Sequence, residues 1–249
     1  MKLPHDKIIF EAKKQLAIDL NCTIDNFDRE GFVFCEAKEN PGRRPFPRGE
    51  RHFEMYSMGK SVIVSATADI LPYIQGQLHT HTTNTNDAFN MPFVYGAGLY
   101  FLPYNLSPLP FADGFTFESV EREDIPILYA FDGFKHAIQY DINHPRPDAL
   151  AMTAKKDGKI VGIAGSSNDC EMLWQIGIDV LPEYQGKGLA SILTGHLAIE
   201  IIKRGRIPYY GTALANVASQ RVAHRAGFQI AWVCAYRGVF DGILTSPTG

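Results

Sequence analysis

Residues 179–190 read Asp-Val-Leu-Pro-Glu-Tyr-Gln-Gly-Lys-Gly-Leu-Ala, and the sequence changes its pattern on either side of this stretch. Before it, apolar side chains alternate with other side chains from Met172 to Val180, the period of a strand with one apolar face. After it, leucine or isoleucine recurs every fourth residue from Leu189 to Ile201, which predicts an amphipathic helix over residues 188–203. A strand, a glycine-containing turn and a helix therefore follow one another directly.

The turn has the chemistry of an anion site. Backbone N–H groups at a helix N-terminus have no partner inside the helix, and the helix dipole adds positive charge there. Gly186 and Gly188 let the backbone approach phosphate oxygens without a Cβ in the way. A nucleotide P-loop, GxxxxGK[ST], is absent, and the dinucleotide motif GxGxxG would require glycine in place of Ser191. Taken alone, the turn fits an ordinary strand-to-helix connection equally well.

Further elements are predicted on both sides of this turn. Asp157-Gly158 separates two apolar stretches and supplies the positive φ angles of a two-residue hairpin turn, so residues 150–164 should form a hairpin. Downstream we expect a strand, a short helix that ends at Gly227, and a last strand, over residues 207–214, 216–227 and 228–234.

Two motifs in the same order resemble the GCN5-related N-acetyltransferase (GNAT) family. Gln185-x-x-Gly188-x-Ala190 after Val180-Leu181-Pro182 is similar to the family's Gln/Arg-x-x-Gly-x-Gly/Ala after Val-x-Pro. The segment from Asn216 to Gly227-Phe228 resembles the later family segment, in which an Asn closes a strand and a helix ends in Gly-Phe. The resemblance covers roughly residues 115–237.

The resemblance implies a fold and a reaction. The fold is α/β (α+β): a mixed, mostly antiparallel sheet in which the strand ending at Val180 splays from the next one and opens a V-shaped slot. The reaction is transfer of an acetyl or longer acyl group from acetyl-CoA to a primary amine by direct attack on the thioester, with no metal. The amine belongs to a small molecule or a peptide, and a homodimer is left open.

The resemblance also assigns the residues that bind the cofactor. The backbones of Ile178 and Val180 would bind the pantetheine arm, and amides from Gln185 to Ala190 would hold the pyrophosphate. Asn216 and Ser219 would contact the cofactor near its pantetheine. The full set of predicted cofactor-binding residues is Ile178, Asp179, Val180, Gln185, Gly186, Lys187, Gly188, Leu189, Ala190, Asn216 and Ser219.

The catalytic residues match the family pattern less well. A protonated alkylamine has a pKa near 10.4 and must lose a proton before it attacks, so a base is expected. Trp174 occupies the strand position where family members often carry Glu, and Glu171 is the first substitute. No Tyr stands where the family often places its general acid. Tyr210 and His224 are the predicted alternatives, with Tyr209 a further candidate.

The first 110 residues are predicted to form a smaller α/β domain, joined to residues 111–249 through the proline-rich stretch 102–110. A helix is expected over residues 7–20, with strands near 31–37 and 61–65. Asp69-Ile70-Leu71-Pro72, followed by Gln75-Gly76, echoes residues 179–186, which raises the hypothesis of a degenerate GNAT-like copy.

Two polar groups in this domain are assigned no function. Arg43, Arg44, Arg48 and Arg51 are interpreted as a solvated loop rather than an anion site. His79 and His81 would lie on one side of a strand, but no third metal ligand accompanies them.

The composition excludes several classes of protein. With 249 residues, 45% hydrophobic residues and a net charge of −3, the chain is typical of a soluble globular protein without attraction to nucleic acid or membranes. The four cysteines are scattered and form no zinc-type spacing, which favours the cytoplasm. Because the family's Glu and Tyr are missing, a catalytically silent acyl-CoA sensor or interaction module is the alternative function.

Overall fold

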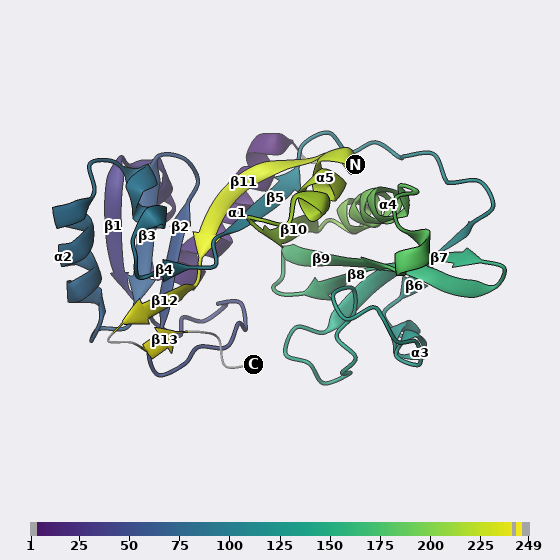
Figure 1. Ribbon diagram of the computed structural model, residues 1–249, viewed down its shortest axis with the longest axis horizontal. Coiled ribbons are helices and arrows are strands. Elements are labelled where there is room, and N and C mark those ends of the chain that lie inside the picture. The colour runs from purple at the N-terminus through teal and green to yellow at the C-terminus, as the bar shows by residue number, and fades with distance from the viewer. Residues whose placement is uncertain (1–3, 241–242, 246–249) are drawn as a thin grey trace. The chain divides into compact units, whose positions relative to one another are not determined.

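The computed structural model describes residues 4–240 and 243–245, which form two compact units (Figure 1). The first unit holds residues 101–211 and 216–229 together with the described residues before 9. The second unit holds residues 9–100, 212–215 and the described residues from 230 onward. The two units therefore alternate along the chain, whereas the sequence predicted a single boundary near residue 110.

The first unit is built on a sheet in the order β10-β9-β8-β7-β6. Neighbouring strands are antiparallel except β9 and β10, which run parallel. The elements are β6 (Thr116–Glu121), α3 (Ile125–Leu128), β7 (Asp148–Lys156), β8 (Lys159–Asn168), β9 (Leu173–Val180), η3 (Pro182–Tyr184), α4 (Leu189–Lys203), β10 (Ile207–Ala213) and α5 (Val217–Arg225). Asp157 and Gly158 have φ angles of 50° and 77°, which confirms the predicted hairpin turn between β7 and β8.

The two faces of this sheet are covered differently. Helix α4 packs on β7, β8 and β9, and most of its apolar side chains are buried. On the other face, the loop after α3 lies against the strands at two glycines. A Cβ on Gly165 would stand 1.9 Å from the carbonyl oxygen of Ala137, and one on Gly177 would stand 1.7 Å from that of His136. The loop backbone therefore rests directly on β8 and β9. Neither α4 nor any other described helix has the length and apolarity to cross a membrane.

The second unit has its own hydrophobic core. Its main strands run in the order β1-β3-β2-β11, and β4, β12 and β13 form a second sheet of three strands. The elements are α1 (His5–Leu20), η1 (Ile24–Asp28), β1 (Gly31–Glu36), β2 (Phe53–Ser57), β3 (Ser61–Ala66), α2 (Leu71–His81), η2 (Thr85–Asn90), β4 (Val94–Tyr95), β5 (Gly98–Pro103), β11 (Phe228–Ala235), β12 (Arg237–Phe240) and β13 (Ile243–Thr245). Strands β5, β10 and β11 contribute residues to both units. Strand β11 pairs with β2, from Val233 opposite Ser57 to Ala235 opposite Met55. This pairing explains why the described residues from 230 onward belong to this unit.

Several predictions for the first 110 residues are confirmed and others are wrong. The predicted helix and both predicted strands correspond to α1, β1 and β3. His79 and His81, however, lie on α2 rather than on a strand. The proline-rich stretch begins inside β5. Gly76 lies inside α2, whereas Gly186 forms a turn with a φ of 76°, so the sequence echo does not reproduce the glycine turn.

The arginine-rich loop is not a solvated surface. The side chains of Arg43, Arg44 and Arg48 are 7%, 3% and 9% exposed. Arg44 Nε donates to Asp19 across 2.6 Å, and Arg43 and Arg48 both pair with Glu39. The interpretation as a solvated loop is therefore wrong, because these guanidinium groups hold the loop to its own unit.

Two of the scattered cysteines come together in the fold. The thiols of Cys22 and Cys35 lie close enough for each to influence the pKa of the other. Beside them, Asn21 Nδ2 donates to the carbonyl oxygen of Glu36 across 2.9 Å. Both thiols are free.

Candidate active site

The parallel ladder between β9 and β10 is short. It runs from Leu173 opposite Ile207 to Ile176 opposite Tyr210. The rest of β9 continues to Val180 in register with β8, up to the pair Gly162 and Val180. In the part of the chain that the structure describes, β9 and β10 form no ladder pair beyond Ile176 and Tyr210. One edge of the last four residues of β9 is therefore not paired with β10, as the V-shaped splay requires.

The glycine turn follows this strand end directly (Figure 1). Gln185 Nε2 donates to the carbonyl oxygen of Val180 across 3.0 Å and closes the turn on the strand. Gly186 and Gly188 have φ angles of 76° and 81°, and a Cβ on either would meet nothing within 4 Å. Glycine is needed there for the backbone conformation. The space in front of both residues is open.

The N-terminus of α4 has donors without acceptors from its own helix. Gly188 is the N-cap and has no side chain to cap the helix, and the first turn contains no acidic residue. The amide of Ile192 donates to the carbonyl oxygen of Gly188, so the amides before it have no helical acceptor. Together with the dipole, this end of α4 can bind an anion. The ammonium group of Lys187 lies 5.0 Å from the ring centre of Tyr184.

Tyr210, the last residue of the ladder, contacts the start of α5. Its hydroxyl lies 2.7 Å from Ser219 Oγ, and Asn216 Oδ1 accepts from the amide of Ser219 across 3.0 Å. Tyr210 is 2% exposed. Burial raises the pKa of Tyr210, while the hydrogen bond with Ser219 opposes that rise. The fold thus brings three predicted residues together where β9 and β10 part.

Two other predicted catalytic residues are exposed. His224 is exposed on α5, and its ring meets the edge of Phe101 at 5.4 Å. Glu171 is exposed in the bend between β8 and β9.

A buried network that the sequence did not predict lies between Glu171 and the end of the ladder. Asp169 is 3% exposed and accepts hydrogen bonds from the hydroxyls of Tyr209 and Ser167. Arg146 Nη1 lies 3.6 Å from Asp169 and donates to Gln175 Oε1 across 3.1 Å. No sequence spacing joins these residues, because four segments bring them together. Asp169 bonds to Tyr209, whose side chain points to the opposite face of β10 from that of Tyr210.

Asp179 positions the covering loop. Its carboxylate accepts from the amides of His136 and Ala137 across 2.7 and 3.0 Å, and from His136 Nδ1 across 2.8 Å. Of the predicted cofactor residues, Asp179 therefore offers its backbone, because its carboxylate is already bonded. Within the described ranges, no group of three or more His, Cys, Asp or Glu side chains is placed to hold a metal ion.

Comparison with known proteins finds a matching family model for part of the chain. Residues 116–228 match the model of the Acetyltransferase (GNAT) family. No match exists among curated proteins.

Three solved structures show the extent of the similarity. A GNAT-family acetyltransferase from Colwellia psychrerythraea is 16% identical over 62% of this chain, with a TM-score of 0.42, and the match spans 62% of that protein. A GCN5-related N-acetyltransferase from Kribbella flavida is 17% identical over 76% of this chain and 70% of that one, with a TM-score of 0.46. An aminoglycoside N-acetyltransferase in complex with CoA is 18% identical over 49% of this chain and 91% of that one, with a TM-score of 0.35. Residues 116–228 of this chain form a domain of the GNAT acetyltransferase family.

Proposed function

We propose that this domain transfers an acetyl or longer acyl group from its CoA thioester to a primary amine. The observation that carries the proposal is the end of the β9–β10 ladder at Ile176 and Tyr210, followed at once by the glycine turn and the uncapped start of α4. An open strand edge offers hydrogen bonds to an amide-containing arm, and the helix start offers them to a pyrophosphate. CoA contains both groups.

The cofactor contacts follow from these two features. Amides from Gly186 to Ala190, with Lys187, would hold the pyrophosphate, while the backbones of Ile178 and Val180 would hold the pantetheine arm. Asn216 and Ser219 border the same place through their contact with each other and with Tyr210. CoA supplies the activated acyl group as a thioester.

The proton transfers need two residues. The amine forms the new C–N bond and the C–S bond breaks, so the amine gives up a proton and the departing thiolate gains one. We propose Tyr210 as the donor, because burial raises its pKa and keeps its hydroxyl protonated near neutral pH. We propose Glu171 as the acceptor, acting through water, with Asp169 as its competitor. His224 remains a second candidate for the donor.

One observation favours the alternative function, a silent acyl-CoA sensor. The only carboxylate on β9 is Asp179, and it holds the covering loop. A sensor would bind acyl-CoA at the same turn without turnover. Binding and turnover therefore have to be measured separately.

Acetyl-CoA should raise the melting temperature, because a ligand that binds only the folded state stabilises it by mass action. At a hundredfold excess over Kd the shift should be about 5–10 °C. ADP, which lacks the pantetheine arm, should do less at the same concentration. Thiol release is then followed with a panel of primary amines.

The possible outcomes separate the two functions. A shift without thiol release for any amine would favour the sensor. The absence of both a shift and calorimetric heat at millimolar acetyl-CoA would make the cofactor assignment wrong.

A further inference from the structure

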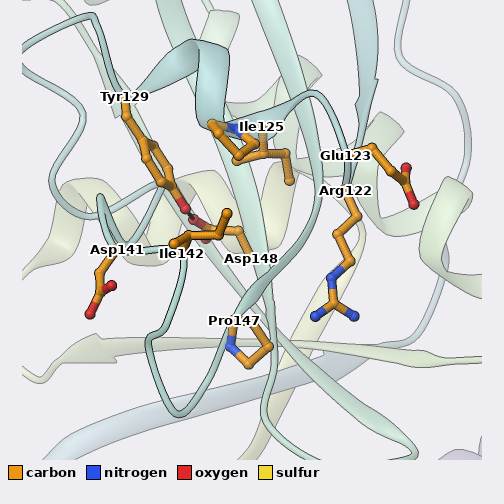
Figure 2. A pocket seen from close by; sticks show the side chains of 9 residues that line it. Arg122, Glu123, Ile125, Tyr129, Asp141, Ile142, Pro147 and Asp148 are labelled. Atoms are coloured by element: carbon orange, nitrogen blue, oxygen red, sulfur yellow. Dashed lines mark hydrogen bonds between the residues drawn. The ribbon is translucent and has the colours of Figure 1, made fainter.

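A pocket of about 300 Å³ lies in the first unit between the start of α3 and the segment that leads into β7 (Figure 2). Its volume is at the lower end of the range for small-molecule sites. The lining residues are Arg122, Glu123, Ile125, Pro126, Tyr129, Asp141, Ile142, Pro147 and Asp148.

Asp148 is the buried charge of this pocket. It is 6% exposed, and its Oδ2 accepts from the Tyr129 hydroxyl across 2.7 Å and from the Gln139 amide across 3.0 Å. Both donors are neutral. Buried carboxylates are normally paired with a cation, because removing the charge from water is costly. Among the described residues, no Lys or Arg forms an ion pair with Asp148. Arg122 lines the same pocket but is exposed.

The pKa values of Asp148 and Tyr129 both shift in the direction expected for a carboxylate that lacks a cation. Burial raises the pKa of Asp148, and the Tyr129 and Gln139 hydrogen bonds and the His144 charge only partly offset that rise. Burial also raises the pKa of Tyr129, and its hydrogen bond with Asp148 raises it further. A cation at Asp148 would stabilise the ionised carboxylate and reverse this shift.

Four of the lining residues, Ile125, Pro126, Ile142 and Pro147, are apolar. Ile125 is buried at its base, with Pro126 and Pro147 alongside, while Ile142 is 70% exposed although it lines the pocket. Figure 2 shows the Tyr129 hydroxyl and the Asp148 carboxylate turned toward each other, with Ile142 beside them. A bare metal ion would need more oxygen or nitrogen ligands than this wall offers. An organic cation with a short apolar chain satisfies both the carboxylate and the wall.

We propose that this pocket binds an alkylammonium group, with the ammonium on the Asp148 carboxylate and the alkyl chain against Ile125 and Ile142. A free amine and a lysine side chain of a peptide share this chemistry. The proposal concerns binding alone, so it stands whether or not the domain transfers an acyl group. The competing explanation is that Asp148 only ties β7 to Tyr129 and Gln139.

The test follows the isoleucine methyl signals of the full chain by NMR during titration with n-butylammonium chloride. We expect saturable shifts of the Ile125 and Ile142 methyls and none at Ile207, which is buried in β10. n-Butanol, which has the same chain without the charge, should bind at least about tenfold more weakly. Equal shifts with n-butanol, or no shifts with either probe, would overturn the proposal.

Asp148→Asn is the decisive variant. Tyr129 and Gln139 both donate to Oδ2, so the Asn oxygen can accept both bonds while the charge is lost. n-Butylammonium should then bind at least about tenfold more weakly, whereas Asp141→Asn at the exposed rim should change little. Unchanged binding in Asp148→Asn, with the wild-type methyl spectrum retained, would leave Asp148 a purely structural residue and the proposal wrong.

The source of the ammonium is tested with a peptide that contains a single lysine and a matched peptide with norleucine. Tighter binding of the lysine peptide than of n-butylammonium would assign the pocket to protein lysines. Tighter binding of n-butylammonium would assign it to free amines. Binding of the norleucine peptide as tightly as the lysine peptide would contradict the role of the charge.

Discussion

At the scale of single residues, Tyr210 and Glu171 have opposite surroundings. Tyr210 is buried and hydrogen-bonded to Ser219, and burial raises its pKa. Glu171 is exposed in a bend, with no hydrogen bond or ion pair from its carboxylate among the described residues. A proton donor benefits from the first environment, because it must stay protonated until the thiolate leaves. An exposed carboxylate can accept a proton from a bound amine directly or through water.

The pH dependence of acyl transfer should report these two roles. Tyr210→Phe should lower the rate by roughly 10²–10⁴-fold and remove the alkaline limb of the profile, because the limb reflects loss of the phenolic proton. Glu171→Gln should lower the rate over a similar range and remove the acidic limb. Acetyl-CoA affinity should change little in either variant. The measurement is the rate of thiol release from pH 5 to 12 at saturating acetyl-CoA, because the raised pKa of Tyr210 places its alkaline limb above pH 10.

Three control variants separate the alternatives. Ser219→Ala removes the hydrogen bond to Tyr210 but keeps the phenol, so the alkaline limb should remain. Full turnover in Glu171→Gln combined with loss of the acidic limb in Asp169→Asn would move the base to Asp169. Loss of the alkaline limb in His224→Gln, with Tyr210→Phe unaffected, would move the acid to the helix surface.

At the scale of helices and strands, the sequence pattern predicted the elements that form from neighbouring residues. The hairpin over β7 and β8, the strand β9 and the helix α4 follow from alternation, periodicity and the Asp157-Gly158 turn. The placement of His79 and His81 was wrong because it considered the two histidines alone, whereas Leu71, Ile74 and Leu78 have the i, i+3, i+7 spacing of a helix. The cluster of Asp169 with Tyr209 and Arg146 had no local signal, because segments distant in sequence form it.

The two ends of α4 provide a matched test of the anion site. Gly188 precedes the helix with a φ of 81°, and Gly205 follows it with a φ of 74°, and a Cβ on either would meet nothing within 4 Å. Gly188→Glu and Gly205→Glu therefore add the same charge under the same backbone strain. Calorimetry should show acetyl-CoA affinity reduced about a hundredfold by the first and little changed by the second, since like charge repels the pyrophosphate only at the N-terminus.

Two other outcomes would contradict the assignment of the anion site. Equal losses of affinity in both variants would point to a general effect of strain on α4. Wild-type affinity in a folded Gly188→Glu protein would exclude the turn as the pyrophosphate site.

At the scale of the whole molecule, one buried carboxylate in each unit has a shifted pKa, and these two pKa values shift in opposite directions. Burial raises the pKa of Asp148 in the first unit. Burial also acts to raise the pKa of Glu54 in the second unit, but the hydrogen bond and charge of His52 bring it below its usual value. A raised carboxyl pKa means that ionisation costs stability as pH rises through it. A lowered one means that ionisation adds stability, which is lost as pH falls through it.

At neutral pH, Asp148→Asn and Glu54→Gln should therefore change the melting temperature in opposite directions. At neutral pH, Asp148→Asn should melt at or above the wild-type temperature, and this difference should shrink as pH falls through the raised pKa. Glu54→Gln should melt below wild type at neutral pH, and its deficit should shrink as pH falls below the usual glutamic acid range. Calorimetric melting between pH 3.5 and 7 makes the comparison. A lower melting temperature for Asp148→Asn at neutral pH than at pH 3.5, relative to wild type, would contradict the sign.

The pairing of β11 with β2 has a consequence for synthesis on the ribosome. β2 is made early, yet its partner residues from Val233 to Ala235 follow Ser57 by roughly 175 residues. At about 5–20 residues per second, this edge of β2 waits on the order of ten to thirty-five seconds for its partner. During that interval the nascent chain presents unpaired backbone N–H and C=O groups, which are a template for wrong partners. Residues 9–100 of the second unit precede most of the first unit, yet the second unit is completed last, so a chaperone that shields β2 should increase the yield of folded protein.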